Sequence, residues 1–432
     1  MHPLRLSLFA LLLLAVFGLS QGANAEKEPL WNYTTGDDVS LVAISADGEY
    51  LVTGGNDRNL SFFNKNSSTP LWTERIGKIY SLTISADGEY IATGGNDYIN
   101  LLGKDNGTSL WRYFTEKRVN SITFSPDGDY IVAGTQYGEV YFFHKGNSTP
   151  LWHYDTGDDV YSVDISMNGE YIVAGSYDHK VYLFGKDSST PLWSYATYDI
   201  MYSVAISADG EYIIAGSNDG RAYFFHKDSS TPLWNYDAES GVYSVAISAN
   251  GEYIAISPSQ RTEVSLFHKD SNEPLWSYWN GYWVYSVAIS ADGEYITTAV
   301  DDRKVYLFSK DSSTPLWSYA TELSARIATI SADGKYIAAG SDDDNIYLFD
   351  NNMSQKSSDD NNGGDNGGSS TEEAVCQHGD SKLADDGFNQ CICNDGKWLC
   401  TDVKEQEESG LSSLSLLSVL TMLGIISILR RR

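Results

Sequence analysis

The first 375 residues of this chain contain no cysteine, because all four cysteines lie between Cys376 and Cys400. Disulfides therefore cannot stabilise the larger part of the protein, and catalysis by a thiolate is excluded there. Basic residues are half as frequent as acidic ones, 29 against 58, which gives a formal net charge of −29. Such a surface repels phosphate, so we expect no nucleic-acid partner.

Long hydrophobic runs are confined to the two ends of the chain. The first follows Arg5 and precedes Ala23 and Ala25, the small residues that signal peptidase requires, so residues 1–25 are predicted to be a signal peptide. The second, residues 411–429, carries no charge. A helix of that length covers about 28 Å, close to the thickness of the bilayer's hydrocarbon core.

Three arginines, residues 430–432, follow the second run directly. A basic cluster of this kind stays cytoplasmic, so the preceding chain is expected to be exported and anchored at the cell surface by a transmembrane helix. The layout is also similar to prokaryotic sorting tails, which are clipped when a protein is attached to the surface. In both alternatives residues 405–410 are a short juxtamembrane segment. Glycosylation is possible outside the cell, with sequons at Asn32, Asn59, Asn66, Asn106, Asn147 and Asn352.

A unit of 40 to 42 residues occurs eight times between Pro29 and Asp350. Each copy has a tyrosine directly after a turn of the ADGE type: Tyr50, Tyr90, Tyr130, Tyr171, Tyr212, Tyr253, Tyr295 and Tyr336. Periods of this size indicate stacked supersecondary units. Four short β-forming runs, such as YSVAIS, YIIAG, AYFFH and PLWNY, alternate with turn residues, so each unit is predicted to be a four-stranded blade.

The order of the strands predicts how the blades close into a ring. The first Leu-Trp strand, Leu30–Tyr33, precedes any set of the other three strands, and the last set has no Leu-Trp strand after it. If residues 30–33 form the fourth strand of the last blade, all eight blades have four strands and the ring closes without an unpaired strand edge. The predicted fold of residues 26–350 is therefore an all-β, eight-bladed β-propeller closed by its N-terminal strand.

The acidic ADGE stretch has two possible interpretations, a catalytic loop or a structural turn. Asp-Gly supplies the backbone angles of a tight hairpin, and Asn-Gly replaces it at Asn168 and Asn250. A catalytic acid would not be interchangeable with asparagine or needed eight times. The sequence therefore favours a turn.

The repeat resembles two families. ISADGEYIIAGSNDGRAYFF looks like a WD repeat, but the tryptophan of its third strand is replaced by Phe63, Phe143, Phe184, Phe225, Phe267, Phe308, Phe349 or Gly103, and the Gly-His dipeptide is missing. KDSSTPLWSY instead looks like the tryptophan-docking repeat of pyrroloquinoline-quinone enzymes and their non-catalytic relatives. That resemblance implies blade-docking tryptophans at Trp31, Trp72, Trp111, Trp152, Trp193, Trp234, Trp276 and Trp317.

The parts of an enzyme are not evident in the repeats. A quinone enzyme of this family would need a calcium site and, in many members, vicinal cysteines. His144, His226 and His268 occupy the same strand end in three different blades, so we expect no metal there. The hairpin acids Asp57, Asp97, Asp178, Asp219, Asp302 and Asp343 are ordinary turn residues, although pairs of them could bind calcium. We therefore expect no cofactor and no catalysis, with a degenerate quinoprotein-like enzyme as the alternative.

Residues 351–375 are polar and glycine-rich, typical of a disordered linker, and residues 376–404 contain the four cysteines. An exported segment with four cysteines indicates two disulfides in one of three pairings, and zinc is the alternative. The segment is similar to pacifastin inhibitors and von Willebrand C repeats, lacking two of their cysteines. That resemblance implies Cys376–Cys393 and Cys391–Cys400 bridges and suggests a serine protease inhibitor as an alternative function.

The connections that differ between repeats are the candidate binding loops, because uniform loops serve the fold. YWNGYWVY places Trp279, Tyr282 and Trp283 in one loop, suited to sugar rings or apolar side chains, unless they pack under the next loop. Two neighbouring loops contain the basic residues Arg75, Lys78, Lys117 and Arg118. They could hold an acidic partner or simply balance nearby acids. The predicted function is a surface-anchored, non-enzymatic scaffold for an extracellular protein or glycan.

Overall fold

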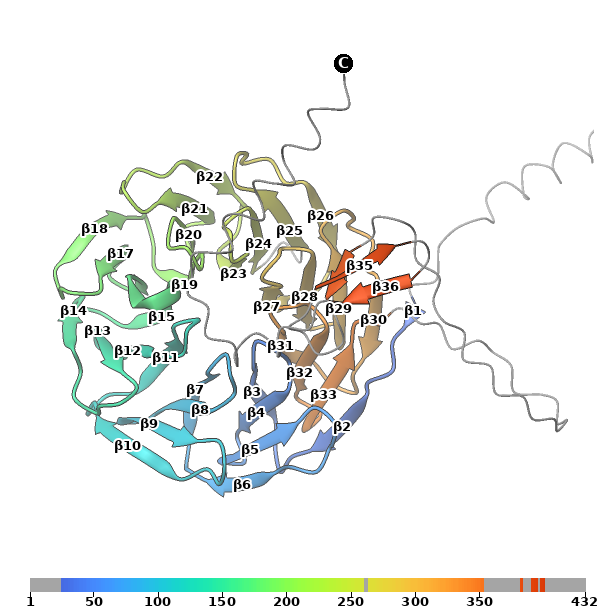
Figure 1. The fold of residues 1–432 in the computed structure, drawn as a ribbon. Helices are drawn as coiled ribbons and strands as arrows, with labels where there is room; N and C mark the ends of the chain where they lie inside the picture. The colour runs from blue at the N-terminus through green and yellow to red at the C-terminus, as the bar shows by residue number, and fades with distance from the viewer. Residues whose placement is uncertain (1–24, 260–262, 353–380, 384–389, 395–396, 401–432) are drawn as a thin grey trace, which may run out of the picture. The chain divides into compact units, whose positions relative to one another are not determined.

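The computed structural model describes residues 25–259, 263–352, 381–383, 390–394 and 397–400 (Figure 1). The chain divides into two compact units, residues 1–354 and 355–432, which are described separately. The predicted signal peptide up to residue 24, the linker from residue 353 to 375 and the apolar segment 411–429 lie outside the described residues. The described part contains no helix that is both long and apolar enough to cross a membrane.

The first unit is a ring of eight antiparallel four-stranded blades, as the repeat predicts (Figure 1). In each blade the first strand lies nearest the centre of the ring and the fourth lies at its outer edge. The strands of blades 1 to 4 are β3 (Val39–Ile44), β4 (Tyr50–Gly55), β5 (Asn59–Asn64), β6 (Trp72–Arg75); β7 (Ile79–Ile84), β8 (Tyr90–Gly95), β9 (Tyr98–Gly103), β10 (Ser109–Phe114); β11 (Val119–Phe124), β12 (Tyr130–Thr135), β13 (Glu139–His144), β14 (Trp152–Asp155); β15 (Val160–Ile165), β16 (Tyr171–Ser176), β17 (Lys180–Gly185) and β18 (Pro191–Ala196).

Blades 5 to 8 repeat the same order of strands. They comprise β19 (Met201–Ile206), β20 (Tyr212–Ser217), β21 (Arg221–His226), β22 (Trp234–Asp237); β23 (Val242–Ile247), β24 (Tyr253–Pro258), β25 (Glu263–His268), β26 (Trp276–Trp279); β27 (Val284–Ile289), β28 (Tyr295–Val300), β29 (Lys304–Ser309), β30 (Trp317–Ala320); β31 (Ala325–Ile330), β32 (Tyr336–Ser341), β33 (Asn345–Asp350) and β2 (Trp31–Thr34). A short 3-10 turn, η1 (Met167–Gly169), replaces the ADGE turn of blade 4.

The ring closes as the strand order predicts. Strand β2 pairs antiparallel with β33, with Trp31 opposite Leu348 and Tyr33 opposite Ile346. The N-terminal strand thus completes blade 8. One further strand was not predicted: β1 (Ala25–Glu26) adds in parallel to the outer edge of β30, which gives blade 7 five strands.

The ADGE stretch is a structural turn. In blade 1, Gly48 takes a φ of 71°, and the Asp47 carboxylate accepts a 2.6 Å hydrogen bond from the Ser45 hydroxyl and a 2.9 Å bond from the Glu49 amide. The absence of a side chain at Gly48 also admits the ring of Tyr336 from the preceding blade, which would lie 2.4 Å from a Cβ at this position. Asp47 therefore stabilises its own hairpin, and Gly48 lets two blades come close.

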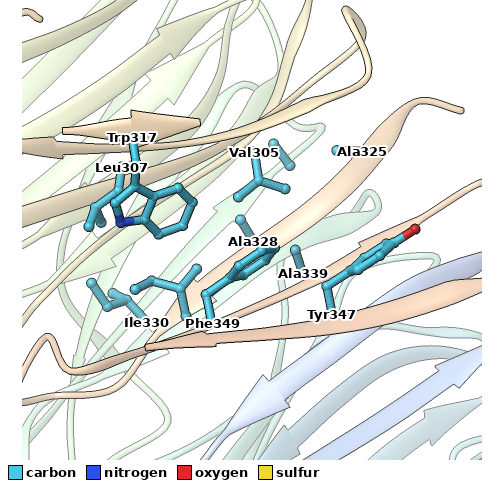
Figure 2. Close-up of a cluster of buried hydrophobic side chains, with 11 residues drawn as sticks. Val305, Leu307, Trp317, Ala325, Ala328, Ile330, Ala339, Tyr347 and Phe349 are labelled. Carbon is cyan, nitrogen blue, oxygen red and sulfur yellow. The ribbon is translucent and has the colours of Figure 1, made fainter. Parts of the chain in front are cut away.

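The hydrophobic core lies between the blades. Figure 2 shows the cluster between blades 7 and 8, in which Leu307 and Trp317 of one blade pack against Ile330 and Phe349 of the next. The phenylalanines predicted from the WD-like strand are fully buried. One assignment was wrong: the register opposes Leu102, not Gly103, to Ile91, so Leu102 fills the phenylalanine position of blade 2 and Gly103 ends the strand.

The blade tryptophans are wedged between neighbouring blades. Trp152 lies 5.2 Å from Phe142 of its own blade and 5.3 Å from Phe184 of the next, measured between ring centroids. Seven indole N–H groups donate 2.6 to 2.8 Å hydrogen bonds to a lysine carbonyl of the following blade: Trp31 to Lys65, Trp72 to Lys104, Trp111 to Lys145, Trp152 to Lys186, Trp193 to Lys227, Trp234 to Lys269 and Trp276 to Lys310. The eighth, Trp317, faces blade 8, which has Asn351 instead of lysine, and its N–H has no hydrogen-bond partner among the described residues.

The second unit is described only in part. Its strands β34 (Ser381–Leu383), β35 (Gln390–Asn394) and β36 (Lys397–Cys400) form a three-stranded antiparallel sheet. The backbone register places Cys391 opposite Cys400. Cys376 lies outside the described residues, and the two disulfides remain a prediction.

Candidate ligand-binding face

Antiparallel blades place two sets of connections on each face of the ring. The ADGE turns and the KDSSTP turns lie on one face, which we call the uniform face. The other, which we call the variable face, carries the connections between blades and the hairpins between second and third strands. The connections between blades are residues 35–38, 76–78, 115–118, 156–159, 197–200, 238–241, 280–283 and 321–324. The hairpins that are described in full are residues 56–58, 96–97, 136–138, 177–179, 218–220, 301–303 and 342–344.

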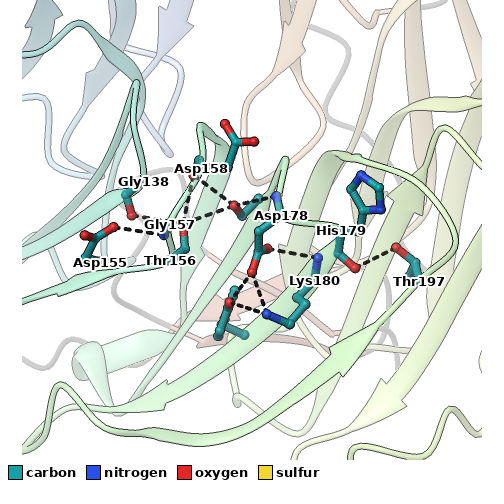
Figure 3. A network of polar contacts seen from close by, with 11 residues as sticks. Gly138, Asp155, Thr156, Gly157, Asp158, Asp178, His179, Lys180 and Thr197 are labelled. Carbon is teal, nitrogen blue, oxygen red and sulfur yellow. Dashed lines mark hydrogen bonds and ion pairs between the residues drawn. The ribbon is translucent and has the colours of Figure 1, made fainter.

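Five of the eight connections between blades begin with a threonine that pins the loop, as Figure 3 shows for Thr156 and Thr197. The Thr156 hydroxyl lies 3.0 Å from the Gly138 carbonyl oxygen and 2.8 Å from that of Asp158. Thr197 makes the same contacts in the next loop, with the carbonyls of His179 and Asp199. These threonines therefore fix the path of the loop, and the two or three residues that follow are presented outward.

The hairpin acids accept hydrogen bonds from their own hairpins, and Asp219 and Asp343 also accept one from an amide of the neighbouring connection between blades. Asp178 accepts hydrogen bonds from the Lys180 amide at 3.1 Å and from the Lys180 ammonium at 2.8 Å (Figure 3). It also accepts a hydrogen bond from the Tyr182 hydroxyl. Burial and the bond to Asp178 raise the pKa of Tyr182. Asp219 and Asp343 bind Tyr223 and Tyr347 in the same way. This pattern supports the turn interpretation of these acids.

The aromatic loop of blade 6 is exposed. Trp279, Tyr282 and Trp283 are 76%, 52% and 53% exposed, so their side chains do not pack under the next loop. Their positions nevertheless differ. Trp283 lines a cleft of about 280 Å³ together with Tyr202, Tyr243, Tyr285, Asn218, Ser259 and Val284, whereas Trp279 ends the outer strand β26 opposite Glu263. The structure therefore brings Trp283 into a cleft and leaves Trp279 outside it.

The tyrosines of this cleft were not predicted as site residues. They belong to an arc in which Tyr161 stacks on Tyr177 at 4.4 Å and Tyr202 lies 4.7 Å from Tyr243. Burial, Tyr243 and Asp199 raise the pKa of Tyr202. The signal was present in the sequence, because tyrosine recurs as the second residue of the inner strand. The packing of neighbouring blades brings together these tyrosines, which lie about 40 positions apart in the sequence.

The four predicted basic residues are clustered only in part. Lys78 and Arg118 both lie 5.1 Å from the ring of Tyr80, and Lys117 lies 4.5 Å from the ring of Tyr137. Arg75 is exposed at the end of β6, three residues before Lys78. Among the described residues, none of these four takes part in an ion pair.

Several other cations of the ring are paired with acids. Arg326 donates two 2.8 Å hydrogen bonds to the Asp342 carboxylate, and Lys145 lies 2.8 Å from Asp129. Burial raises the pKa of Asp38, and Asp342 and Asp37 contribute to the same shift. The variable face thus carries a cationic sector, which includes Lys78 and Arg118, and an acidic one.

The histidines do not converge. His144, His226 and His268 end β13, β21 and β25 in three separate blades, and His226 lies 3.1 Å from Glu211. They provide no shared metal site. The one close group of carboxylates among the described residues consists of Asp37, Asp38 and Asp344 on the variable face.

Comparison with known proteins shows the type of repeat and the fold. A model of the outer membrane protein assembly factor BamB matches residues 95–250. The WD domain, G-beta repeat model matches residues 27–64, 272–309 and 317–350. A search of curated proteins gave no match.

Solved structures with the same architecture have low sequence identity. Sqt1 from Chaetomium thermophilum, bound to the N-terminus of the ribosomal protein L10, matches with a TM-score of 0.66 and 16% identity, covering 75% of this chain and all of that one. Sqt1 from Saccharomyces cerevisiae gives 0.67 and 12%, covering 76% and 99%. The designed protein Ika8 gives 0.64 and 12%, covering 73% and 97%. The chain is an eight-bladed β-propeller built of WD-type and BamB-type repeats.

Proposed function

We propose that this protein is a surface-anchored, non-enzymatic scaffold that binds an extracellular protein or glycan through the variable face. The observation that carries the proposal is the contrast between the faces. On the uniform face the repeated polar side chains bond to their own turns, whereas the variable face, besides threonines and acids that bond in this way, presents unlike aromatic and cationic groups. Uniform bonding serves the fold, and unlike exposed groups on rigid loops are what recognition requires.

The binding part of the proposal is supported by the repeats. The BamB model describes an assembly factor, and the C. thermophilum Sqt1 structure contains a bound protein segment. The Sqt1 structure thus shows that a propeller of similar fold can bind a protein segment, and loops positioned by a rigid scaffold are suited to such binding. Anchoring rests on the sequence alone, through the apolar segment 411–429 and the arginines after it.

Two regions of the variable face suit different parts of a ligand. Exposed Trp283 and the cleft beside it offer flat rings to a sugar or an apolar side chain. Lys78, Lys117 and Arg118, without acidic partners among the described residues, suit carboxylate or sulfate groups. A ligand that covers both regions would be acidic at one end and carry rings at the other.

The experiment is a binding screen of the exported chain against glycans and extracellular proteins. Variants that change only one region, Trp279→Ala with Trp283→Ala and Lys117→Glu with Arg118→Glu, are screened in parallel. The proposal requires that each variant loses the ligands that the wild-type protein binds. Surface anchoring is tested separately, by asking whether a tag placed before residue 411 is accessible on intact cells.

A further inference from the structure

Three of the six sequons lie in equivalent turns of consecutive blades. Asn66, Asn106 and Asn147 belong to the turns that connect the third strand to the fourth in blades 1, 2 and 3. These turns lie on the uniform face. All three asparagine side chains are exposed. In an exported protein, an exposed sequon in a surface turn is suited to carry an N-linked glycan.

The amide nitrogens of these three side chains are free to react. The side-chain oxygen of Asn106 accepts hydrogen bonds from the Thr108 amide, at 3.1 Å, and from the Thr108 hydroxyl. The side-chain oxygen of Asn147 accepts a 2.9 Å hydrogen bond from the Thr149 amide. In both turns the third residue of the sequon thus holds the oxygen of the asparagine. Among the described residues, the side-chain nitrogens of Asn66, Asn106 and Asn147 donate no hydrogen bond.

The sequon at Asn59 differs from those in the turns because the folded blade uses its polar groups. The side-chain nitrogen of Asn59 donates a 3.0 Å hydrogen bond to the Asp57 carboxylate. Ser61, the third residue of this sequon, is 4% exposed, and its hydroxyl lies 2.9 Å from that of Thr73. A glycan on Asn59 would break the hydrogen bond to Asp57, so we expect none on the folded protein.

The two remaining sequons lie outside the turns between third and fourth strands. The side-chain nitrogen of Asn352 donates a 3.2 Å hydrogen bond to Asp350. Asn32 is exposed, but it lies in the closing strand β2, opposite Tyr347. The inference concerns only the three turns.

The turns that contain the three sequons lie next to exposed leucines. The residue before each blade tryptophan is a leucine, and seven of these eight leucines are 48–57% exposed: Leu30, Leu71, Leu110, Leu151, Leu192, Leu233 and Leu275. Leu71, Leu110 and Leu151 follow the three sequon asparagines by four or five residues. The turns before Leu192, Leu233 and Leu275, in blades 4 to 6, contain no sequon. A glycan is bulky and hydrophilic, so it can cover an apolar side chain close to its point of attachment.

We propose that the exported chain carries N-linked glycans at Asn66, Asn106 and Asn147, and that these glycans cover the exposed leucines of blades 1 to 3. The donor is an oligosaccharide linked to a lipid diphosphate, and a transferase catalyses the reaction. The asparagine Nδ2 forms a bond to C1 of the first sugar and loses one proton. The bond from C1 to the diphosphate breaks, and the diphosphate leaves with the electron pair.

The glycans leave the candidate binding surface open. No asparagine of a sequon lies in the connections or hairpins of the variable face. The inference rests on export, which is part of the proposed function. The experiment therefore uses two versions of the full chain, one with its own residues 1–25 and one with a host signal peptide in their place.

The test maps the modified sites on the folded protein purified from a eukaryotic cell line that transfers N-glycans. An endoglycosidase that converts each glycosylated asparagine to aspartate is used in heavy-oxygen water, and mass spectrometry locates the label. We expect label at Asn66, Asn106 and Asn147 and none at Asn59. The matched control is Asp187→Asn, which makes the exposed KDSSTP turn of blade 4 identical to the KNSSTP turn of blade 1. This variant should gain a glycan in blade 4.

Hydroxyl-radical footprinting tests whether the glycans cover the leucines. Leu71, Leu110 and Leu151 should be oxidised at least twofold more slowly before enzymatic removal of the glycans than after it. The leucines of blades 4 to 6 serve as internal controls, and their oxidation should not change. Equal oxidation of Leu71, Leu110 and Leu151 with and without glycans would show that the glycans do not cover them.

Two results of the site mapping would overturn the assignment of the turns. The first is the absence of glycans from the three turns in a chain that is exported behind the host signal peptide. The second is a glycan on Asn59 in the folded protein. Modification behind the host signal peptide but not behind residues 1–25 would support the assignment of the turns and contradict the export that the proposed function requires.

Discussion

The uniform and variable faces of the ring use similar side chains for different purposes. On the uniform face, the Lys145 ammonium lies 2.8 Å from Asp129 and 5.0 Å from the ring of Tyr90 in the preceding blade. On the variable face, Lys117 also lies over a tyrosine ring, at 4.5 Å, but it has no acidic partner among the described residues. The first lysine is part of the junction between blades. Lys117 is held over the ring of Tyr137, and no acid among the described residues neutralises its charge, so the ammonium group can contact a ligand.

The largest expected effect lies in the blade junctions. Trp152→Ala removes an indole wedged between Phe142 and Phe184, together with its hydrogen bond to the Lys186 carbonyl. We expect a loss of about 3–5 kcal/mol in the free energy of unfolding, measured by denaturant titration. Trp283→Ala is the control on the variable face, and at 53% exposure it should cost less than about 1 kcal/mol. Equal losses for the two variants would remove the distinction between the faces.

The second effect concerns Asp164 in the inner strand β15 of blade 4. Burial raises the pKa of Asp164 to about 6, although the amides of Ile165 and Ile206 each donate it a 2.9 Å hydrogen bond. A raised folded-state pKa means that the folded protein binds the proton more tightly. The contribution of Asp164 is therefore most favourable below about pH 4 and is lost as the pH rises through 6.

Asp164→Asn removes this titration. The free energy of unfolding of the variant, relative to the wild type, should increase by about 2–3 kcal/mol between pH 4 and pH 7. Other acids titrate equally in both proteins, so the difference isolates Asp164. A difference that stays constant with pH would contradict the assignment.

A smaller effect compares the two lysines directly. Lys145→Met breaks an ion pair and a cation–π contact between blades, and we expect a loss of about 1 kcal/mol. Lys117→Met loses only the contact with Tyr137, for which about 0.5 kcal/mol is expected. Denaturant titration at low and high salt separates the two, because salt should reduce only the first loss. If Lys117→Met is the more destabilising, its role is structural and not that of a ligand contact.

Much of the fold could be predicted from the sequence, because each repeat gives the same evidence independently. The position of Trp31 before the first complete set predicted the closure, and the exchange of Asp for Asn at residue 168 identified the turn. Gly103 was assigned to the phenylalanine position by its spacing in the sequence, whereas the strand register places Leu102 there. The site was harder to predict. Strand periodicity could not show that Tyr202 and Tyr243 meet, or that residues 25–27 cover Trp317, because both depend on how distant segments meet in the closed ring.

The most direct test of the account is to measure the affinity of the protein for the ligand identified in the screen, with matched variants on the two faces. The variable-face variants are Trp279→Ala with Trp283→Ala, and Lys117→Glu with Arg118→Glu. The uniform-face variant is Ser188→Ala with Thr190→Ala, in an exposed KDSSTP turn where the Thr190 amide donates to the Ser188 hydroxyl. With all proteins shown to be folded by circular dichroism, the account predicts that both variable-face variants abolish binding and that the uniform-face variant keeps the wild-type affinity. Loss of binding only in the uniform-face variant would contradict it.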